Sequence, residues 1–186
     1  MEPGKRTKIA NNILVRNMDG IRYGPASANT NFDEGFISSS NQIEFNSRDG
    51  IRIDTSAWTG WLDSTVSQSD TIRRNGGAGV HVVTGSRLKN FDVMNGRMIE
   101  NVGAAVRIDG AVDGGSIVGN RMRDLRSGAA RLQTSAIIGS GAMSNIDIDG
   151  NQFAGPGAAL ALTGQQTNVG RVANAVEIPW RHAPGM

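Results

Sequence analysis

The sequence predicts an all-β fold, a parallel β-helix solenoid of about six coils with three short strands in each coil. Three observations predict this fold. Apolar residues recur in two columns at intervals of 23 to 31 residues, and their neighbours alternate between apolar and polar. Glycine or asparagine stands at constant offsets from these columns, where the chain has to turn. The 25 glycines among 186 residues suit such corners.

The first column comes from short alternating segments that begin with glycine or alanine. Its inward residues are Ile21, Ile51, Val80, Val106, Ala130 and Leu160, in the segments GIRYG, GIRID, GVHVV, AVRID, AARLQ and ALALT. In GIRID the two isoleucines point to one side while Arg52 and Asp54 point to the other, as expected of a half-buried strand.

A second column has a similar spacing and predicts a second strand in each coil. Its inward residues are Ile43, Ile72, Met98, Met122, Phe153 and Val176. A third set of apolar residues precedes the second column and predicts a third strand: Ile37, Val66, Val93, Ile117, Ile148 and Val172. The variation in spacing is expected to lie in the loops between coils.

Asparagines mark two sets of corners. Four of them stand two residues before the second column, and three stand five residues before the first: Asn41, Asn120, Asn151 and Asn174, then Asn46, Asn75 and Asn101. Asparagine tolerates the left-handed backbone that a sharp bend needs. We expect these side chains to stack and to hydrogen-bond from coil to coil.

Three regions are predicted. Residues 1–16 form a basic N-terminal arm and cap, residues 17–178 form the β-helix, and residues 179–186 form a C-terminal tail. The arm contains Lys5, Arg6 and Lys8, and the tail contains two prolines that end the repeat.

Composition excludes several classes of function. Nineteen lysines and arginines against 17 acidic residues leave a formal net charge of +2, too small for nucleic-acid binding by bulk electrostatics. Because there is no cysteine, disulfide frameworks and cysteine-ligated metal sites are excluded. No apolar run is long enough to cross a bilayer, and the segment MEPGKRTKIANN lacks the hydrophobic stretch of a signal peptide.

The segments NGGAGVHVVTG, IENVGAAVRIDG and NIDIDGNQFAG resemble coils of the right-handed β-helix, pectate-lyase-like superfamily. The resemblance covers about residues 17–178 and implies an all-β, right-handed parallel β-helix solenoid. That superfamily includes polysaccharide lyases, glycoside hydrolases, sugar epimerases, and the tailspikes and other surface proteins of bacteriophages. It therefore implies a fold and leaves the activity open.

The outward residue after the first column is cationic in most coils. This column reads Arg22, Arg52, His81, Arg107, Arg131 and Ala161. Strands of neighbouring coils are about 4.8 Å apart, so unpaired cations in this column would repel one another. Asp54 and Asp109 stand two residues beyond Arg52 and Arg107, and a structural ladder of salt bridges is one interpretation. In the other interpretation, this face is a groove for an anionic glycan or for an acidic strip of a neighbouring subunit, lined by Arg52, His81, Arg107 and Arg131. The resemblance implies the same face, because β-helix polysaccharide enzymes often carry their groove there.

Two tryptophans, Trp58 and Trp61, lie in the longer excursion TSAWTGWLDST. Two roles are open for these side chains. In one, the indoles stack on sugar rings or dock a partner subunit; in the other, they pack locally and hold the loop against the solenoid.

Candidate catalytic residues are few. Asp54 and Asp109 stand two coils apart, about 10 Å, which is within the range of a carboxylate pair in a glycoside hydrolase. A lyase would use His81 or Arg107 as its base. The acids are spread along the strands and the histidines have no metal-ligand spacing, so we expect no metal site and no cofactor.

These observations favour a virion-associated spike, fibre or decoration protein of a bacteriophage. We expect it on the virion surface as a homotrimer that contacts other virion proteins and a host-surface glycan. The alternative is a secreted, extracellular polysaccharide lyase or glycoside hydrolase that acts on an acidic polysaccharide. Six coils are short for the long groove that the resemblance implies for such enzymes, which favours the structural protein.

Overall fold

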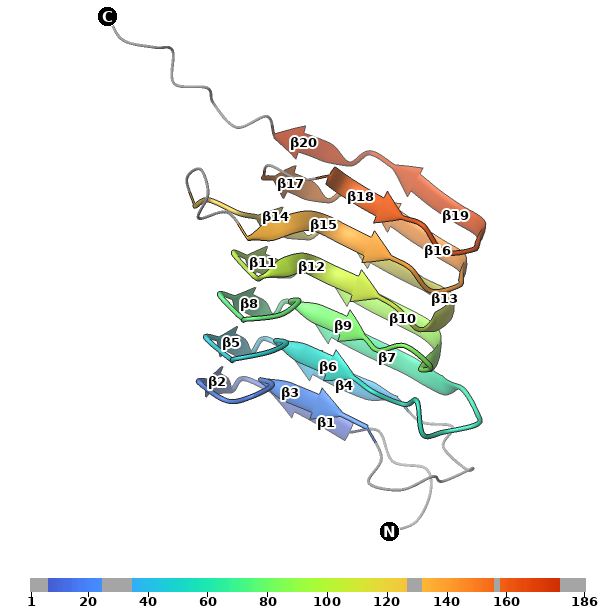
Figure 1. Ribbon diagram of the computed structural model, residues 1–186, viewed down its shortest axis with the longest axis horizontal. Coiled ribbons are helices and arrows are strands. Elements are labelled where there is room, and N and C mark those ends of the chain that lie inside the picture. The colour runs from blue at the N-terminus through green and yellow to red at the C-terminus, as the bar shows by residue number, and fades with distance from the viewer. Residues whose placement is uncertain (1–6, 25–34, 127–131, 156–157, 178–186) are drawn as a thin grey trace, which may run out of the picture.

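A computed structural model describes residues 7–24, 35–126, 132–155 and 158–177 of the chain. In these residues the protein is a stack of short parallel strands, and each strand pairs with the equivalent strand of the next coil (Figure 1). The prediction of an all-β parallel β-solenoid is confirmed, and the expected six coils are close to the number observed. None of the described residues belongs to a helix long and apolar enough to cross a membrane.

Three parallel sheets enclose the core. Sheet A contains β1 (Thr7–Ala10), β4 (Phe36–Ser39), β7 (Leu62–Gln68), β10 (Arg87–Met94), β13 (Ala111–Val118), β16 (Met143–Asp149) and β19 (Gln166–Val172). Sheet B contains β2 (Ile13–Val15), β5 (Gln42–Glu44), β8 (Thr71–Arg73), β11 (Arg97–Ile99), β14 (Arg121–Arg123), β17 (Gln152–Ala154) and β20 (Ala175–Glu177). Sheet C contains β3 (Ile21–Tyr23), β6 (Ile51–Ile53), β9 (Val80–Val82), β12 (Gly103–Ile108), β15 (Gln133–Gly139) and β18 (Ala158–Leu162).

Strand register confirms the second column. Each of its predicted residues pairs with the next in sheet B, from Ile43 with Ile72 to Phe153 with Val176. Ile43, Ile72 and Met98 are completely buried in the core. This pairing follows from the period, since one inward residue per strand stacks on its equivalent about 4.8 Å away.

The first column is confirmed in sheet C except in the fifth coil. There Ile137, and not the predicted Ala130, pairs with Val106. Ala130 itself lies outside the described residues. The 31-residue step from Val106 to Ile137 equals the step from Met122 to Phe153 in the second column, so both strands shift together.

The fifth coil shifts because a long excursion separates β14 from β15. Asp124, at the start of this excursion, is buried, and one of its carboxylate oxygens accepts the backbone N–H groups of Leu132 and Gln133 at 2.9 Å. The carboxylate also pairs with Arg126 at 2.7 Å. Asp124 therefore holds the two ends of the loop together and delays the start of the next strand.

The third set of apolar residues is only partly correct. Val93, Ile117 and Ile148 are buried, as predicted. In β4 and β7 the inward positions are held by buried Ser38 and Ser67 instead, and the predicted apolar neighbours Ile37 and Val66 lie partly exposed on the outer surface of sheet A. The last member of the set, Val172, is 63% exposed.

The predicted asparagine ladders are present at both corners. Between sheets B and C, the backbone N–H of Asn46 donates to the side-chain oxygen of Asn75, and that of Asn75 donates to Asn101. At the corner between sheets A and B, Asn120 and Asn151 are linked in the same way. Each buried amide also donates to a backbone carbonyl, for example Asn75 to Ile43, so the ladder satisfies polar groups that the bend leaves buried.

The N-terminal strands lie in the segment predicted as arm and cap. β1 pairs with β4 in sheet A, and β2 pairs with β5 in sheet B. The predicted C-terminal tail, residues 179–186, lies outside the described residues, as do Lys5 and Arg6.

Candidate functional site

The predicted cationic column runs along the outer surface of sheet C. Arg22, Arg52, His81 and Arg107 occupy successive equivalent positions of four neighbouring strands. The position above Arg107 belongs to Ile138 because of the shift in the fifth coil. Ala161 follows it in β18, as predicted. Arg131, for which the sequence predicted the place of Ile138, lies outside the described residues.

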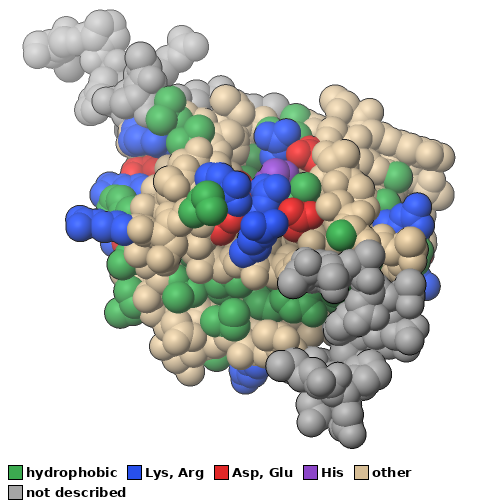
Figure 2. Space-filling model, turned by 60° about the horizontal axis from the view of Figure 1, so that its bottom comes forward, with side chains coloured by type: hydrophobic (Ala, Val, Ile, Leu, Met, Phe, Trp, Pro, Cys, Tyr) green, Lys and Arg blue, Asp and Glu red, His purple; other side chains and the backbone are tan. Residues whose placement is uncertain are grey.

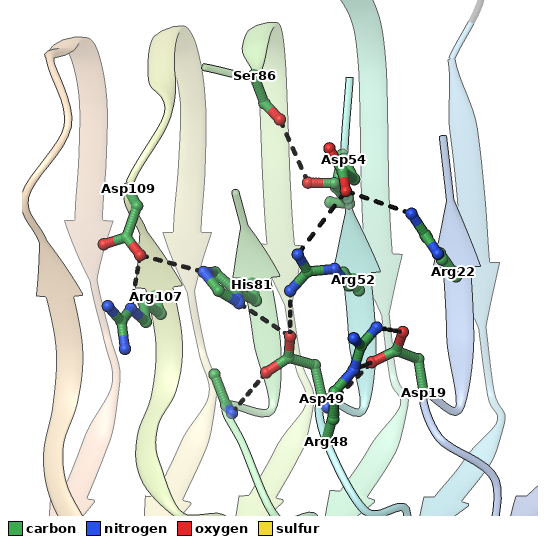
Figure 3. Close-up of polar contacts among 12 residues, drawn as sticks. Asp19, Arg22, Arg48, Asp49, Arg52, Asp54, His81, Ser86, Arg107 and Asp109 are labelled. Carbon is green, nitrogen blue, oxygen red and sulfur yellow. Dashed lines mark hydrogen bonds and ion pairs between the residues drawn. The ribbon is translucent and has the colours of Figure 1, made fainter. Parts of the chain in front are cut away.

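Carboxylates alternate with the cations of this column. Figure 3 shows Arg52 and His81 both directed toward Asp49, which lies in the loop before β6. Oδ2 of Asp49 is 3.1 Å from Nη1 of Arg52 and 2.9 Å from Nδ1 of His81. Asp54 lies 3.5 Å from Arg22 and 3.7 Å from Arg52 on the other side. The salt-bridge interpretation of the sequence therefore describes this face.

His81 links the two halves of the network. Its Nδ1 contacts Asp49 and its Nε2 lies 3.1 Å from Oδ2 of Asp109. Arg107 Nε contacts the same Asp109 oxygen at 2.7 Å. A neutral imidazole has one N–H, so both ring nitrogens donate to carboxylates only when the ring is protonated. In that state His81 is an imidazolium held between two anions.

The carboxylates of the network are held in their charged form. Burial alone would raise the pKa of Asp109, but hydrogen bonds from Ser140, Arg107 and His81 outweigh it, and its pKa lies below the usual range. The same opposition applies to Asp49, where burial is outweighed by His81 and by the backbone N–H of Ala78.

The pKa of Asp54 is also lowered, chiefly by the hydrogen bond from Ser56 and, against the effect of burial, by the charge of Arg52. Asp54 and Asp109, the predicted hydrolase pair, thus belong to one chain of ion pairs that runs through Asp49 and His81. A glycosidase general acid needs a raised pKa at neutral pH. Both carboxylates have the opposite shift, which disfavours the hydrolase chemistry.

A hollow of about 320 Å³ opens beside the ladder, at the corner between sheets B and C. It is lined by Ser47, Arg48, Asp49, Gly76, Gly77, Ala78, His81, Val102, Gly103, Ala104 and Arg107. Figure 2 shows basic side chains gathered on this face around a histidine, with acidic side chains between them. Arg48 pairs with Asp19, yet its side chain and that of Arg107 remain 43% and 49% exposed.

Arg107 has unused hydrogen-bond donors at the hollow. Only its Nε is engaged among the described residues, by Asp109. The two terminal nitrogens are left for a planar, forked contact with a carboxylate or another oxyanion. Arg52, by contrast, is 20% exposed and contacts Asp49 and Asp54, so it belongs to the ladder.

The two predicted tryptophans have different environments. Trp58 is 7% exposed in the core cluster and meets Tyr23 edge-on at 6.4 Å between ring centroids. Its indole therefore packs locally, which was one of the two interpretations, and is not available to stack on a ligand. Trp61 is 37% exposed, and Nζ of Lys89 lies 5.9 Å from its ring.

Two features of the charged surface were missed from the sequence. Asp49, the centre of the network, lies in a loop, where the alternation of a strand does not predict which side chains point outward. Arg97 and Arg121 stand in register on sheet B, each immediately before an inward methionine of the second column. They stand before the inward residue, whereas the cations of sheet C stand after it, so the offset that holds for sheet C does not reach them. Within the described ranges, no group of three or more histidine, aspartate or glutamate side chains is arranged to hold a metal ion.

Comparisons with family models, with curated proteins and with solved structures find no match to this chain.

Proposed function

We propose that this chain is a virion-associated spike, fibre or decoration protein of a bacteriophage, assembled as a trimer, that binds an anionic glycan of the host surface. The observation that carries the binding role is Arg107, which is half-exposed at the edge of the sheet C hollow and has two free terminal nitrogens within the described part of the chain. A forked guanidinium of this kind matches the carboxylate of an acidic sugar.

The network beneath Arg107 supports binding by holding this side chain in place. Asp109 fixes Arg107 through Nε, while Ser140 at 2.6 Å and His81 at 3.1 Å fix Asp109. A side chain positioned before the ligand arrives loses less conformational freedom on binding. The hollow next to it has a floor of small residues, Gly76, Gly77 and others, which leaves room for a sugar ring.

The chemistry of the face supports binding without turnover. Its carboxylates have lowered pKa values and are occupied by cations, so none is suited to deliver a proton to a glycosidic oxygen. The structural role is supported by the asparagines at the two corners, because they tie neighbouring coils together by side-chain as well as backbone hydrogen bonds.

The test is a binding titration by calorimetry with polygalacturonate and alginate as acidic polysaccharides and dextran as a neutral one. We expect binding to at least one acidic polymer, none to dextran, and an affinity at least about tenfold weaker in Arg107→Ala. Arg22→Ala is the matched control, since Arg22 lies on the same column but outside the hollow.

An unchanged affinity in Arg107→Ala, or equal binding of dextran, would contradict the proposed site. Release of new reducing ends or of unsaturated uronates during incubation would favour the lyase or hydrolase instead. A strictly monomeric chain in solution would contradict the trimeric spike.

A further inference from the structure

Sheet B carries cations that have no counter-charge within the described chain. Arg97 and Arg121 are exposed, lie directly above one another, and contact no carboxylate among the described residues. Nε of Arg121 donates to the side-chain oxygen of Gln152 at 3.2 Å. Like charges at adjacent positions of a sheet are destabilising. Unlike the arginines of sheet C, this pair has no carboxylate among the described residues to relieve its repulsion.

Sheet A carries several acidic side chains on the outer surface of its fourth to sixth coils, with Lys89 in register with Asp113 beside them. Asp92 and Asp147 lie in one column with Ser116 between them, and Asp113 and Asp149 flank that column. None of these four carboxylates is in a salt bridge within the described residues. One oxygen of Asp149 is buried without any hydrogen-bond partner, which is costly for a carboxylate in an isolated chain.

Both sheets carry outward-facing apolar residues toward the N-terminal end. On sheet B, Ile13 and Val15 of the first coil are 71% and 41% exposed. On sheet A, Ile37 and Val66 face outward in register while buried serines take the inward positions. Ile37 and Val66 are partly exposed, and apolar residues outside with serines inside invert the usual arrangement of a strand, as an interaction surface would require.

We propose that the outer surface of sheet A of one copy packs against the outer surface of sheet B of a second copy, and that this contact repeats around a three-fold axis to give the trimer. The inference rests on the trimeric assembly proposed above and names the two surfaces that form it. The contact is heterologous, joining two different surfaces, and such contacts close into rings when the rotation allows.

The positions along the solenoid agree with this arrangement. Symmetry about an axis parallel to the solenoid places equal coils of all copies at equal heights. Arg97 and Arg121 belong to the fourth and fifth coils, and the sheet A acids belong to the fourth to sixth coils. The apolar residues of both sheets belong to the first three coils. Arg97 and Arg121 therefore face acidic side chains at the same or neighbouring heights, and the exposed apolar residues of sheet B lie one to two strand spacings from Ile37 and Val66 of sheet A.

A second copy fits these surfaces better than an anionic glycan does. A polyanion would satisfy the arginines of sheet B but would leave the acids of sheet A and the apolar residues of both sheets uncovered. The proposed contact also leaves sheet C, with Arg107 and its hollow, outside the interface.

Sedimentation velocity on the purified full chain tests the contact. We expect a trimer for the wild type and a dissociation constant raised at least tenfold in R97E/R121E and in D92R/D147R. The chain that carries all four changes restores opposite charges across every contact, and its trimer should return. The matched control R22E/R107E makes the same charge reversal on sheet C and should keep the trimer. Thermal melting followed by circular dichroism verifies that each variant is folded.

The outcomes separate this inference from the proposed function. A wild-type trimer that persists in folded R97E/R121E overturns the contact but leaves the trimeric spike intact. A trimer that fails to return in the four-residue variant also overturns the contact. If R97E/R121E leaves the mass unchanged and abolishes binding of polygalacturonate, sheet B binds glycan and the contact is wrong. A monomeric wild-type chain contradicts both the contact between sheets A and B and the trimeric spike.

Discussion

Sheets B and C each carry a column of arginines, but only the column on sheet C is neutralised within the described chain. On sheet C, Asp49 stands between Arg52 and His81, so attraction replaces repulsion along the solenoid. On sheet B, Arg97 and Arg121 are stacked without a carboxylate. The same strand spacing therefore produces two kinds of charged surface. Charges that are paired inside the chain stabilise the fold and hold side chains in position, whereas unpaired charges are available to bind a partner.

The largest effect is expected from removal of the carboxylate at the centre of the sheet C network. Asp49→Ala leaves Arg52 and His81 facing each other in a site where the Asp49 side chain is 7% exposed. We expect the free energy of unfolding to fall by about 3 kcal/mol, as for other buried ion pairs that lose one partner. Urea denaturation at a concentration where the chain is monomeric measures it. A loss below about 1 kcal/mol would mean that the ladder contributes little.

Stability should be nearly as sensitive to substitution at the corner between sheets B and C. Asn75 accepts hydrogen bonds from Asn46 and donates to Asn101 and to the carbonyl of Ile43, all in a buried position. Asn75→Ala leaves several buried polar groups without partners, and we expect a loss of about 2 kcal/mol in the same denaturation experiment. A change within about 0.5 kcal/mol would contradict the importance of the ladder.

Part of the pH dependence of stability should come from the carboxylates of sheet C. Because folding lowers the pKa values of Asp49, Asp54 and Asp109, their stabilising effect is present above the unfolded-state value near pH 4 and is lost as the pH falls through the lower folded values. We expect the thermal midpoint to fall between about pH 4 and pH 2. Asp49→Ala should show a shallower fall than the wild type, and an identical slope would show that other groups control acid unfolding.

The smallest effect on the stability of the monomer is expected on sheet B. Arg97→Ala removes a like-charge contact with Arg121 and no salt bridge within the described chain. The free energy of unfolding of the monomer should stay unchanged or rise by less than about 0.5 kcal/mol. A loss of more than about 1 kcal/mol would show that Arg97 has a stabilising role inside the chain.

Periodicity was sufficient to predict the solenoid, because each coil repeats the same inward residue and the same corner. It failed where a loop changed the register. AARLQ has the pattern of a strand, but the carboxylate of Asp124, which receives the N–H groups of Leu132 and Gln133, postpones β15 to the following segment. The pattern also failed in β4 and β7, where hydrophobicity suggested that Ile37 and Val66 point inward. Those strands bury serines, and Ser67 donates to buried Asp70 at 2.8 Å.

The candidate site was only half predictable. Arg52, His81, Arg107, Asp54 and Asp109 were all placed on one face by counting from the first column. Their roles depend on Asp49, which reaches the face from a loop that alternation does not describe. Whether a cation is paired or free depends on such contacts between coils, so the sequence alone left both interpretations open.

The most direct test of whether unpaired charges on sheets A and B hold copies together is sedimentation velocity of the wild-type chain at low and high salt. Contacts between exposed charges weaken as salt screens them. We expect about three times the chain mass of 19.6 kDa at about 0.1 M salt or below, and dissociation toward one chain at about 1 M salt. A single-chain mass under both conditions would contradict it.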